Sequence, residues 1–370
     1  MNVANNRFDL VRLLLAFAVF LYHAVALSAA APNGQLEVIL GEVAELSIQG
    51  FFIVSGLLVY GSLERSNTLA DYAGKRVRRL YPAYAVIVLI PVIFSAVLSF
   101  GQTGASGDIL RYIGANLAFL NFLEPSLPGL FQEQRFSDVN GALWTLKIEV
   151  MFYLALPILA WGLTKLKTYW WMGIALIVFA AFVWKQAVLA MEIPESAQLS
   201  RQLPGQMMYF AAGMALWRLW PLLASRARLA FAIGAVTLAA ALLVPALDAV
   251  RVLGLAGLIA GVAFMPGPPL AAARWGDISY GVYIVHFPIV QGLVMVGAFA
   301  ILGLAGGILL STILVFAASY LLWWWVEKPA LRKDSHYRKI SEEGTQDERI
   351  RNDHAGRDAS WNSDPHAKSP

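Results

Sequence analysis

The side chains best suited to chemistry in this sequence lie in one apolar stretch, residues 7–31, and are Asp9, Arg12 and His23. A helix turns by about 100° and rises by about 1.5 Å per residue, so Arg12 and His23 are offset by only about 20° and lie roughly 16 Å apart. Asp9 is about 40° from His23 on the same face. An ionisable group at membrane depth is costly unless it faces protein or water, so this face is a candidate functional site. The alternative is a histidine that packs between helices and two charges that reach the lipid headgroups.

A second candidate is Glu149, which lies in the apolar stretch LWTLKIEVMFY at residues 143–153. If each stretch starts at a membrane surface, Glu149 and His23 are both about 8 to 10 Å below the same surface of a hydrocarbon core about 30 Å thick. A buried carboxylate orients a neighbouring imidazole, selects its tautomer and raises its basicity. The sequence therefore predicts that Glu149 positions His23 as a general base. The alternative pairs Glu149 with Lys147 or Arg135 near the surface.

The segment KRVRR at residues 75–79 contains four cations within five residues. Arg76 and Arg79 are one helical turn apart and point the same way, and guanidinium groups match phosphate oxygens bidentately. The pair predicts a clamp for a phosphate-bearing donor; the alternative is an anchor held by anionic lipid. In the preceding apolar stretch, Ser55 and Gly56 form a small pair. This pair either lets helices approach closely or leaves a slot for a narrow acyl-bearing arm.

A second histidine within an apolar stretch, His286, belongs to SYGVYIVHFP at residues 279–288. Pro288 lacks a backbone N–H and kinks the helix. The His286 ring therefore either satisfies a carbonyl that the proline leaves unpaired or contributes to the site. Farther along, Glu327 follows three tryptophans that are typical of a membrane interface. We expect Glu327 to hold an arginine of the basic segment.

The elements that position these residues are membrane-spanning helices. Of the 370 residues, 58% are hydrophobic and 14% are charged, whereas soluble domains are roughly 45–50% apolar and about 25% charged. The first apolar run is too long, and too charged, for a cleavable signal peptide. The basic residues lie in short loops beside apolar runs, where they report topology rather than a nucleic-acid partner. The chain has no cysteine, which excludes disulfides, thiolate metal sites and a cysteinyl-acyl intermediate, and we expect no metal.

Ten apolar runs of about twenty residues, the length that a helix needs to cross the hydrocarbon, predict an all-α polytopic membrane protein embedded in a lipid bilayer. The runs fall near residues 8–30, 43–63, 81–101, 142–164, 169–190, 204–222, 228–246, 250–266, 277–298 and 303–326. Most Lys and Arg residues outside the runs fall on one side of this topology, around residues 7, 65–79, 165–167, 226–228, 274 and 328–333. The other side holds Arg111, Arg135, Arg201 and Arg251. By the positive-inside rule, both termini are cytoplasmic.

Two further segments are not counted as spans. Residues 108–123 are amphipathic and are followed by prolines, so they predict an interfacial or re-entrant helix on the outer side. The polar C-terminal tail predicts disorder from about residue 341. We therefore divide the chain into a membrane domain at residues 1–332 and a cytoplasmic tail at residues 333–370.

Together these motifs resemble the type 3 integral-membrane acyltransferases, which include O-antigen and exopolysaccharide O-acetyltransferases. The resemblance runs from Asn6 to about Arg332 and is carried by six features in order. They are the spacing of Arg12 and His23, FFIVSG at 51–56, RVRRLYPAY at 76–84, LWTLKIEVMFY at 143–153, SYGVYIVHFP at 279–288 and EKP at 327–329. Family members often have two adjacent acidic residues after the tryptophan, whereas Val150 follows Glu149 here.

The resemblance implies an acyltransferase of a bacterial cytoplasmic membrane. It would move an acetyl or other short acyl group from acetyl-CoA, bound on the cytoplasmic side, to a hydroxyl of a cell-surface or exported carbohydrate. The expected catalytic residues are His23, Glu149, Arg12 and Asp9. The expected donor-binding residues are Arg76, Arg79, Ser55, Gly56 and Arg12, and the expected acceptor-binding residues are Trp144, Tyr283 and His286. His23 would act as the base directly, or would itself carry the acyl group.

A different class of protein is the alternative: a proton-coupled transporter or flippase of a sugar or lipid-linked sugar. Buried His, Arg and Glu side chains also suit such carriers. The sequence contains no evident inverted repeat and no matching pair of interrupted spans, which are typical of transporters. The basic segment at residues 75–79 also has no function in a carrier beyond topology. The acyltransferase interpretation is therefore favoured.

Overall fold

The computed structural model describes residues 7–265 and 276–332, and within these residues the chain is helical with no strand. The predicted tail at 333–370 and the charge at Arg274 lie outside the described residues. The α-helices are α1 (Phe8–Ser28), α2 (Gln35–Glu64), α3 (Leu69–Leu98), α4 (Ala105–Leu117), α5 (Trp144–Lys165), α6 (Trp170–Leu189), α7 (Ser196–Ser200), α8 (Leu203–Ser225), α9 (Ala227–Leu243), α10 (Arg251–Phe264), α11 (Ser279–Met295), α12 (Ala298–Leu322) and α13 (Lys328–Ala330). Shorter turns are η2 (Gly141–Leu143), η3 (Lys167–Tyr169), η4 (Pro245–Val250) and the π-helical turn η6 (Trp323–Glu327).

Each of the ten apolar runs contains a helix, so the all-α prediction is confirmed. Seven of the described helices are long and apolar enough to cross a membrane, or eight if α8 and α9, which meet at a bend of 119°, form one broken span. Helix α11 has 17 residues and is shorter than these spans. The structure supports seven or eight spans by length and composition rather than ten, because an apolar run is not always one straight helix of full length.

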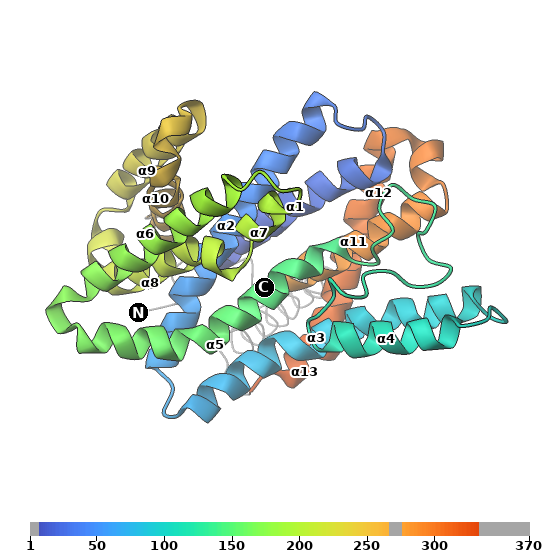
Figure 1. Cartoon of the computed structure of the whole chain (residues 1–370), viewed down its shortest axis with the longest axis horizontal. Helices are drawn as coiled ribbons and strands as arrows, with labels where there is room; N and C mark the ends of the chain where they lie inside the picture. Colours follow the sequence, from blue (N-terminus) through green and yellow to red (C-terminus); the bar gives the residue numbers. More distant parts are fainter. Residues whose placement is uncertain (1–6, 266–275, 333–370) are drawn as a thin grey trace, which may run out of the picture.

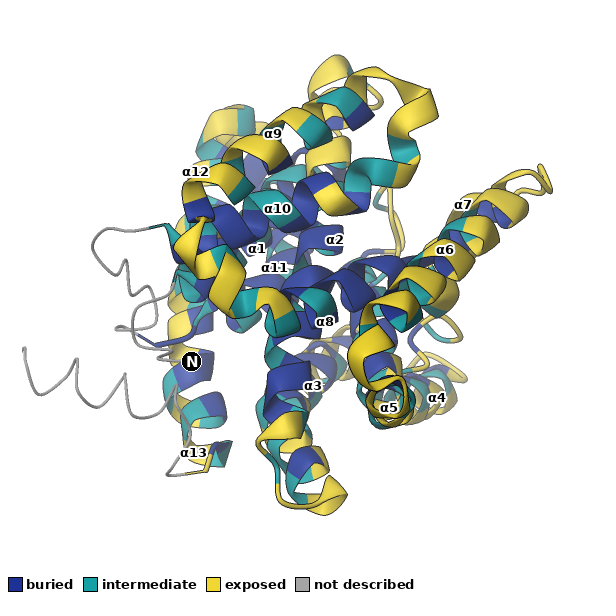
Figure 2. Ribbon diagram, turned by 90° about the vertical axis from the view of Figure 1, so that its left-hand side faces the viewer, coloured by how far each residue is buried: buried dark blue, intermediate teal, exposed yellow. Residues whose placement is uncertain are grey.

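Helices α1, α2, α8 and α11 lie in the interior of the bundle, whereas α6 and α9 carry few buried positions (Figure 2). Helices α2 and α8 pack closely against each other. A Cβ on Gly56 would lie 2.1 Å from the Phe210 carbonyl oxygen, and a Cβ on Gly213 would lie 2.0 Å from that of Ile53. Both positions require glycine, because any side chain would force the helices apart. Of the two interpretations of Gly56, close packing of helices and a slot for an acyl-bearing arm, the structure supports close packing.

Helices α1 and α11 run in the same direction and lie side by side. Arg12 near the start of α1 contacts Asp277 just before α11, and His23 near the end of α1 contacts His286 in the middle of α11. Arg79, near the start of α3, lies beside Asp277 as well. We call this end of the bundle the arginine end, and the other the opposite end.

The segment predicted at the outer surface forms α4, which starts three residues earlier and ends six residues earlier than the range 108–123. It lies along α3 (Figure 1). Tyr84, well inside α3, donates a hydrogen bond to the carbonyl of Asn116 near the end of α4 at 2.6 Å. Helix α4 therefore runs back along α3 toward the middle of that helix. This position favours a re-entrant helix over an interfacial helix that lies flat on the membrane.

The loop before α5 enters the bundle instead of remaining at its surface. Asn140 Nδ2 donates to the Ile284 carbonyl at 2.8 Å, and Ile284 precedes Pro288 by four residues on α11. This is the carbonyl that a proline leaves without its helical N–H partner. Asn140, not His286, therefore completes the hydrogen bonds of α11. As a result, α5 begins beside the middle of α11, deeper than the sequence analysis assumed.

Replacing Asn140 with leucine should lower the melting temperature of the detergent-solubilised protein. The Ile284 carbonyl would be buried without a donor, at a cost of about 1–3 kcal/mol. Pro288→Ala supplies an N–H that can bond this carbonyl, so N140L should cost much less in a P288A background. Thermal unfolding of the four proteins in this double-mutant cycle measures the difference. Equal losses in both backgrounds would contradict this role of Asn140.

Candidate active site

A network of buried charges closes the arginine end of the bundle. The Asp277 carboxylate accepts hydrogen bonds from Arg12 Nη1 at 2.6 Å and from Arg79 Nη2 at 2.5 Å. Arg79 Nη1 also donates to Glu327 at 2.7 Å. Both carboxylate side chains are only 1% exposed. The two arginines therefore supply the compensating charge that such deep burial requires.

Local backbone geometry presents the two carboxylates to the arginines. Gly276 has a φ of 110°, in the region that favours glycine, and a Cβ there would lie 2.4 Å from Trp323 Cδ1. Ser279 Oγ donates to the Oδ1 oxygen of Asp277 at 2.6 Å and holds the carboxylate in place. Residues 323–327 form a π-helical turn, an irregularity that is frequent at functional sites. This turn ends at Glu327, directly beside Arg79.

The Arg79–Glu327 ion pair confirms the prediction that Glu327 binds an arginine of the basic segment. Arg79 is therefore already engaged by two carboxylates. Asp277 and Glu327 are distant from Arg79 in the sequence, and the fold brings both carboxylates against it.

Asp277 is the member of this network that the sequence analysis missed. A signal was present, because Asp277 is an acidic residue at the start of an apolar run on the arginine-rich side. Arg12 was expected to bind the donor, and in the structure it binds Asp277. Asp9 lies within electrostatic range of Asp277, Arg12 and Arg79.

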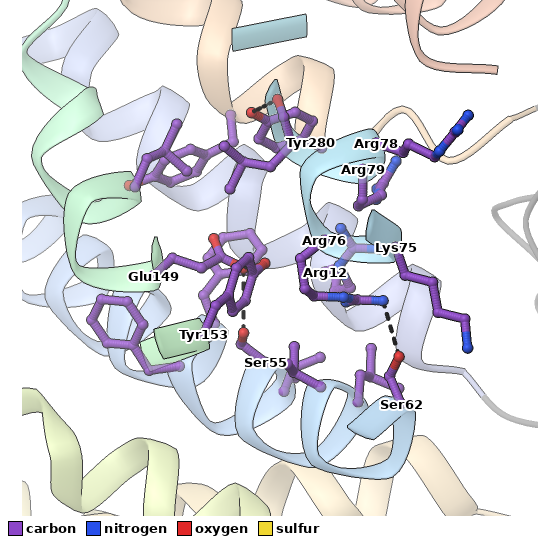
Figure 3. A pocket seen from close by; sticks show the side chains of 18 of the residues that line it. Arg12, Ser55, Ser62, Lys75, Arg76, Arg78, Arg79, Glu149, Tyr153 and Tyr280 are labelled. Carbon is purple, nitrogen blue, oxygen red and sulfur yellow. Dashed lines mark hydrogen bonds between the residues drawn. The ribbon is translucent and has the colours of Figure 1, made fainter. Parts of the chain in front are cut away.

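A cavity of about 710 Å³ opens beside this network. Figure 3 shows Lys75, Arg78 and Arg79 on one side of it and Glu149 on the other. Glu149 is the one carboxylate among the described residues that line the cavity. The lining includes seven cations: Arg12, Arg65, Lys75, Arg76, Arg78, Arg79 and Arg332. This excess of positive charge suits a ligand that carries several negative charges.

Three of the lining cations have no carboxylate within ion-pair distance among residues 7–265 and 276–332: Arg65, Arg76 and Arg78. Arg76 Nη2 donates to Ser62 Oγ at 3.2 Å, and its guanidinium lies over the Tyr153 ring at 5.9 Å. The Nε of Arg76 is buried and has no hydrogen-bond partner in the described part of the chain. Arg76 is therefore the cation best placed to bind an anionic ligand.

The wall of the cavity away from the cations carries hydroxyl groups. Glu149 Oε1 accepts hydrogen bonds from Tyr153 at 2.5 Å and from Ser55 at 3.3 Å. One turn farther from the arginine end, the hydroxyls of Thr145 and Tyr283 are 2.8 Å apart and both line the cavity. Ser55 faces the cavity, as expected if this pair leaves a slot for an acyl-bearing arm. Its neighbour Gly56 is packed against α8 and is not among the described residues that line the cavity.

Two histidines face each other beyond the end of the cavity. His23 Nδ1 and His286 Nε2 are 2.9 Å apart, and His286 Nδ1 is 3.0 Å from the Val282 carbonyl oxygen. The ring of Phe287 packs edge-on against His23, with the ring centroids 5.1 Å apart. His286 is fully buried, whereas His23 is partly exposed. Neither histidine is among the described residues that line the cavity.

The structure corrects the predicted partnership between Glu149 and His23, since His286 is the hydrogen-bond partner of His23. Tyr283 lies three residues before His286 on α11 and is level with Thr145. Glu149 lies four residues after Thr145 on α5. His286, and His23 beside it, therefore lie three residues beyond the Thr145–Tyr283 level, and Glu149 lies four residues before it. At about 1.5 Å per residue, Glu149 is about 10 Å closer to the arginine end than His23. The predicted depths agreed only because α5 was assumed to begin at the membrane surface.

The three predicted acceptor residues occupy different places. Tyr283 lines the cavity. His286 uses both ring nitrogens inside the bundle, so it has none left to bind a carbohydrate. Trp144 is half-buried against the hydrophobic core and is not part of the described cavity lining. In the described residues, no group of three or more His, Cys, Asp or Glu side chains is arranged to hold a metal ion.

Comparison with known proteins adds an independent observation. A family model described as an acyltransferase domain matches residues 5–324. The chain is 27% identical to an O-acetyl transferase of Shigella phage Sf6 over 354 residues, which cover 90% of this chain and 97% of that protein. It is 29% identical to nodulation protein 10 of Rhizobium leguminosarum bv. viciae over 322 residues, covering 79% of this chain and 84% of that protein. No solved structure matches the chain.

Replacing Asp277 with asparagine should destabilise the fold strongly, because it removes the negative charge that Arg12 and Arg79 share. Removing one partner of a buried ion pair typically costs about 3–5 kcal/mol. The matched control is Asp71→Asn, whose carboxylate pairs with Lys75 and Arg332 in a more exposed position and should contribute little to stability. Thermal unfolding in detergent compares the two variants, and equal shifts would show that the network does not hold the bundle together.

Proposed function

The chain belongs to the acyltransferase family whose model spans it, and from that membership we propose that it is an O-acyltransferase of a bacterial cytoplasmic membrane. It moves an acetyl or other short acyl group from a cytoplasmic acyl-CoA to a hydroxyl of a cell-surface or exported carbohydrate. The observation that carries the proposal is the cavity that leads from a cluster of cations, past hydroxyl groups, toward a pair of histidines. The name of the phage relative, an O-acetyl transferase, supports acetyl as the transferred group and oxygen as its acceptor.

The phosphates of the donor bind at the cationic side of the cavity. Arg65, Arg76 and Arg78, which have no carboxylate partner in the described part of the chain, contribute the phosphate contacts. Charge-assisted hydrogen bonds from guanidinium groups to phosphate are short and strong. Arg12 and Arg79 have a different part in this proposal: they hold α1 and α3 in place through Asp277.

The pantetheine arm of the donor lies along the cavity wall that contains Glu149. This arm carries amide N–H groups, and the Glu149 carboxylate, held by Tyr153 and Ser55, is an acceptor for them. The acyl end then reaches the hydroxyls of Thr145 and Tyr283 at the end of the cavity. The roughly 16 Å between Arg12 and His23 along α1 is a distance that such a narrow arm can cover.

His23 acts as the general base for the acceptor. The hydroxyl oxygen attacks the thioester carbonyl carbon while its proton passes to His23, and the carbon–sulfur bond breaks. The thiolate of the departing CoA takes this proton, so an ester and free CoA are formed and His23 returns to its neutral state. The partial exposure of His23 gives the acceptor access, and general-base catalysis of this kind typically contributes about 10²–10⁴-fold. The Thr145–Tyr283 hydrogen bond must open for the thioester to reach His23.

Arg76→Ala should raise the KM for acyl-CoA about 10- to 100-fold, because a hydrogen bond to a charged group contributes about 1.5–3 kcal/mol. Its melting temperature should change little, since Arg76 touches Ser62 and no described carboxylate. The matched control, Arg111→Ala, removes an exposed arginine that pairs with Asp108 and Glu124 away from the cavity. Steady-state kinetics with varied acyl-CoA measures both. An unchanged KM in R76A, or the same rise in R111A, would place the phosphates elsewhere.

The proposed reaction is tested with purified protein in liposomes, labelled acetyl-CoA and surface polysaccharide from the host bacterium. Label should become ester-linked to the carbohydrate, and His23→Ala should lower the rate by about 10²–10⁴-fold while the protein still inserts into the membrane. Wild-type rates in H23A would remove the assignment of the base. Movement of unmodified sugar across the membrane, with no labelled ester, would instead indicate a transporter.

A further inference from the structure

The contacts of His286 determine which of its ring nitrogens carries the hydrogen. His286 Nδ1 is 3.0 Å from the Val282 carbonyl oxygen, and a carbonyl oxygen can only accept a hydrogen bond. Nδ1 of His286 must therefore be the donor. In a neutral imidazole the other nitrogen then has a lone pair, so His286 Nε2 is an acceptor.

The same reasoning extends to His23. Its Nδ1 is 2.9 Å from His286 Nε2, and because Nε2 accepts, Nδ1 of His23 must donate. Nε2 of His23 is thereby left with a lone pair. An unconstrained neutral imidazole prefers its hydrogen on Nε2, so these contacts reverse the ordinary preference of the ring.

We propose that His286 is a positioning residue that holds His23 in the Nδ1–H tautomer, so that Nε2 of His23 is the nitrogen that takes the proton of the acceptor hydroxyl. The Val282 carbonyl is the fixed start of this chain of hydrogen bonds. The catalytic meaning of the inference rests on the proposed acyl transfer. When Nε2 accepts the proton, the bond from His23 Nδ1–H to the lone pair of His286 becomes charge-assisted and stabilises the imidazolium. The proton then leaves with the thiolate, so none is gained or lost.

The surroundings of His286 keep the ring in this arrangement. Its side chain is fully buried, and the rings of Phe20, Tyr283 and Phe287 lie around it with centroid distances of 6.3, 6.0 and 6.5 Å. Aromatic neighbours offer no strong alternative acceptor to Nδ1–H. The carbonyl that sets the tautomer belongs to the same helix, one turn earlier, so its position relative to the ring is fixed by α11 itself.

Solid-state NMR of the full chain in lipid bilayers, with ¹⁵N-labelled histidine, reads the tautomers directly. The chain has five histidines, and replacing His336, His354 and His366, which lie outside the described residues, with glutamine leaves the signals of His23 and His286. At a mildly alkaline pH, both rings should carry hydrogen on Nδ1 and a bare Nε2. A hydrogen on Nε2 of His23 would overturn the inference, whatever the activity of the protein.

Two amide variants at position 286 connect the tautomer to catalysis. A glutamine places its side-chain oxygen near the former Nε2 and can accept from His23 Nδ1–H, whereas an asparagine reaches only as far as the former Nδ1. His286→Asn should therefore shift the His23 signals toward the Nε2–H form and lower kcat about 100-fold below that of His286→Gln, the lower end of a general-base contribution. The KM for acyl-CoA should be the same in both. Equal kcat values in the two variants would contradict the positioning role.

The tautomer measurement also separates this inference from the proposed function. If both rings show Nδ1–H but the protein transfers no acyl group in liposomes, the tautomer assignment stands and the acyltransferase proposal falls. If H23A abolishes transfer while wild-type His23 carries its hydrogen on Nε2, the base assignment stands and the role of His286 is wrong. Should either amide variant fail to fold, the wild-type spectrum still decides the question.

Discussion

The Asp277 carboxylate is the contact on which the rest of the structure depends, because it joins α1, α3 and the start of α11 at one buried point. On the parallel pair α1 and α11 it forms the first of two cross-links, Arg12 to Asp277, and His23 to His286 is the second. The cross-links are eleven residues apart on α1 and nine on α11, or about 16 and 13 Å. The long side chain of Arg12 absorbs this difference. Neither helix can slide or rotate without breaking both contacts, so the ion pair at one end sets the alignment of the histidines at the other.

This arrangement divides the arginines into two groups with different physical tasks. A buried carboxylate is tolerated when it is paired and hydrogen-bonded, and Arg12 and Arg79 meet that requirement for Asp277 and Glu327. Within residues 7–265 and 276–332, two cations and two carboxylates form this network and leave it close to neutral, so it contributes rigidity more than long-range attraction. The positive potential of the cavity then comes from the cations outside the network. A substitution in the first group should therefore change the stability of the fold, and one in the second should change the affinity for the proposed anionic donor.

The sequence predicted which residues share a face of one helix, because this depends only on their spacing. It did not predict how deep one helix lies relative to another. Helical periodicity put Arg12 and His23 on one face of α1, and that face lies against α11 in the structure. The depth of Glu149 was wrong because it required the level at which α5 begins, and Asn140 sets that level through a contact with Ile284, 144 residues away. Asp277 was signalled by its place at the start of an apolar run, but a single acid at such a place does not show which distant arginines it will bind. Contacts between distant residues leave little trace in one sequence without its relatives.

The separation between the cavity and His23 has a physical purpose in the proposed transfer of an acyl group across a membrane. An uninterrupted polar path from one side of the bundle to the other would let water and protons pass, and water near a bound thioester would hydrolyse it. The cavity instead ends at the Thr145–Tyr283 hydrogen bond, and the buried His286 stands between this pair and the partly exposed His23. The proposed donor and acceptor therefore approach from different directions and meet only when this short barrier opens. Because the barrier consists of side chains on α5 and α11, and α11 is tied to α1 by Asp277, local side-chain movement can admit the acyl group while the helices keep their places.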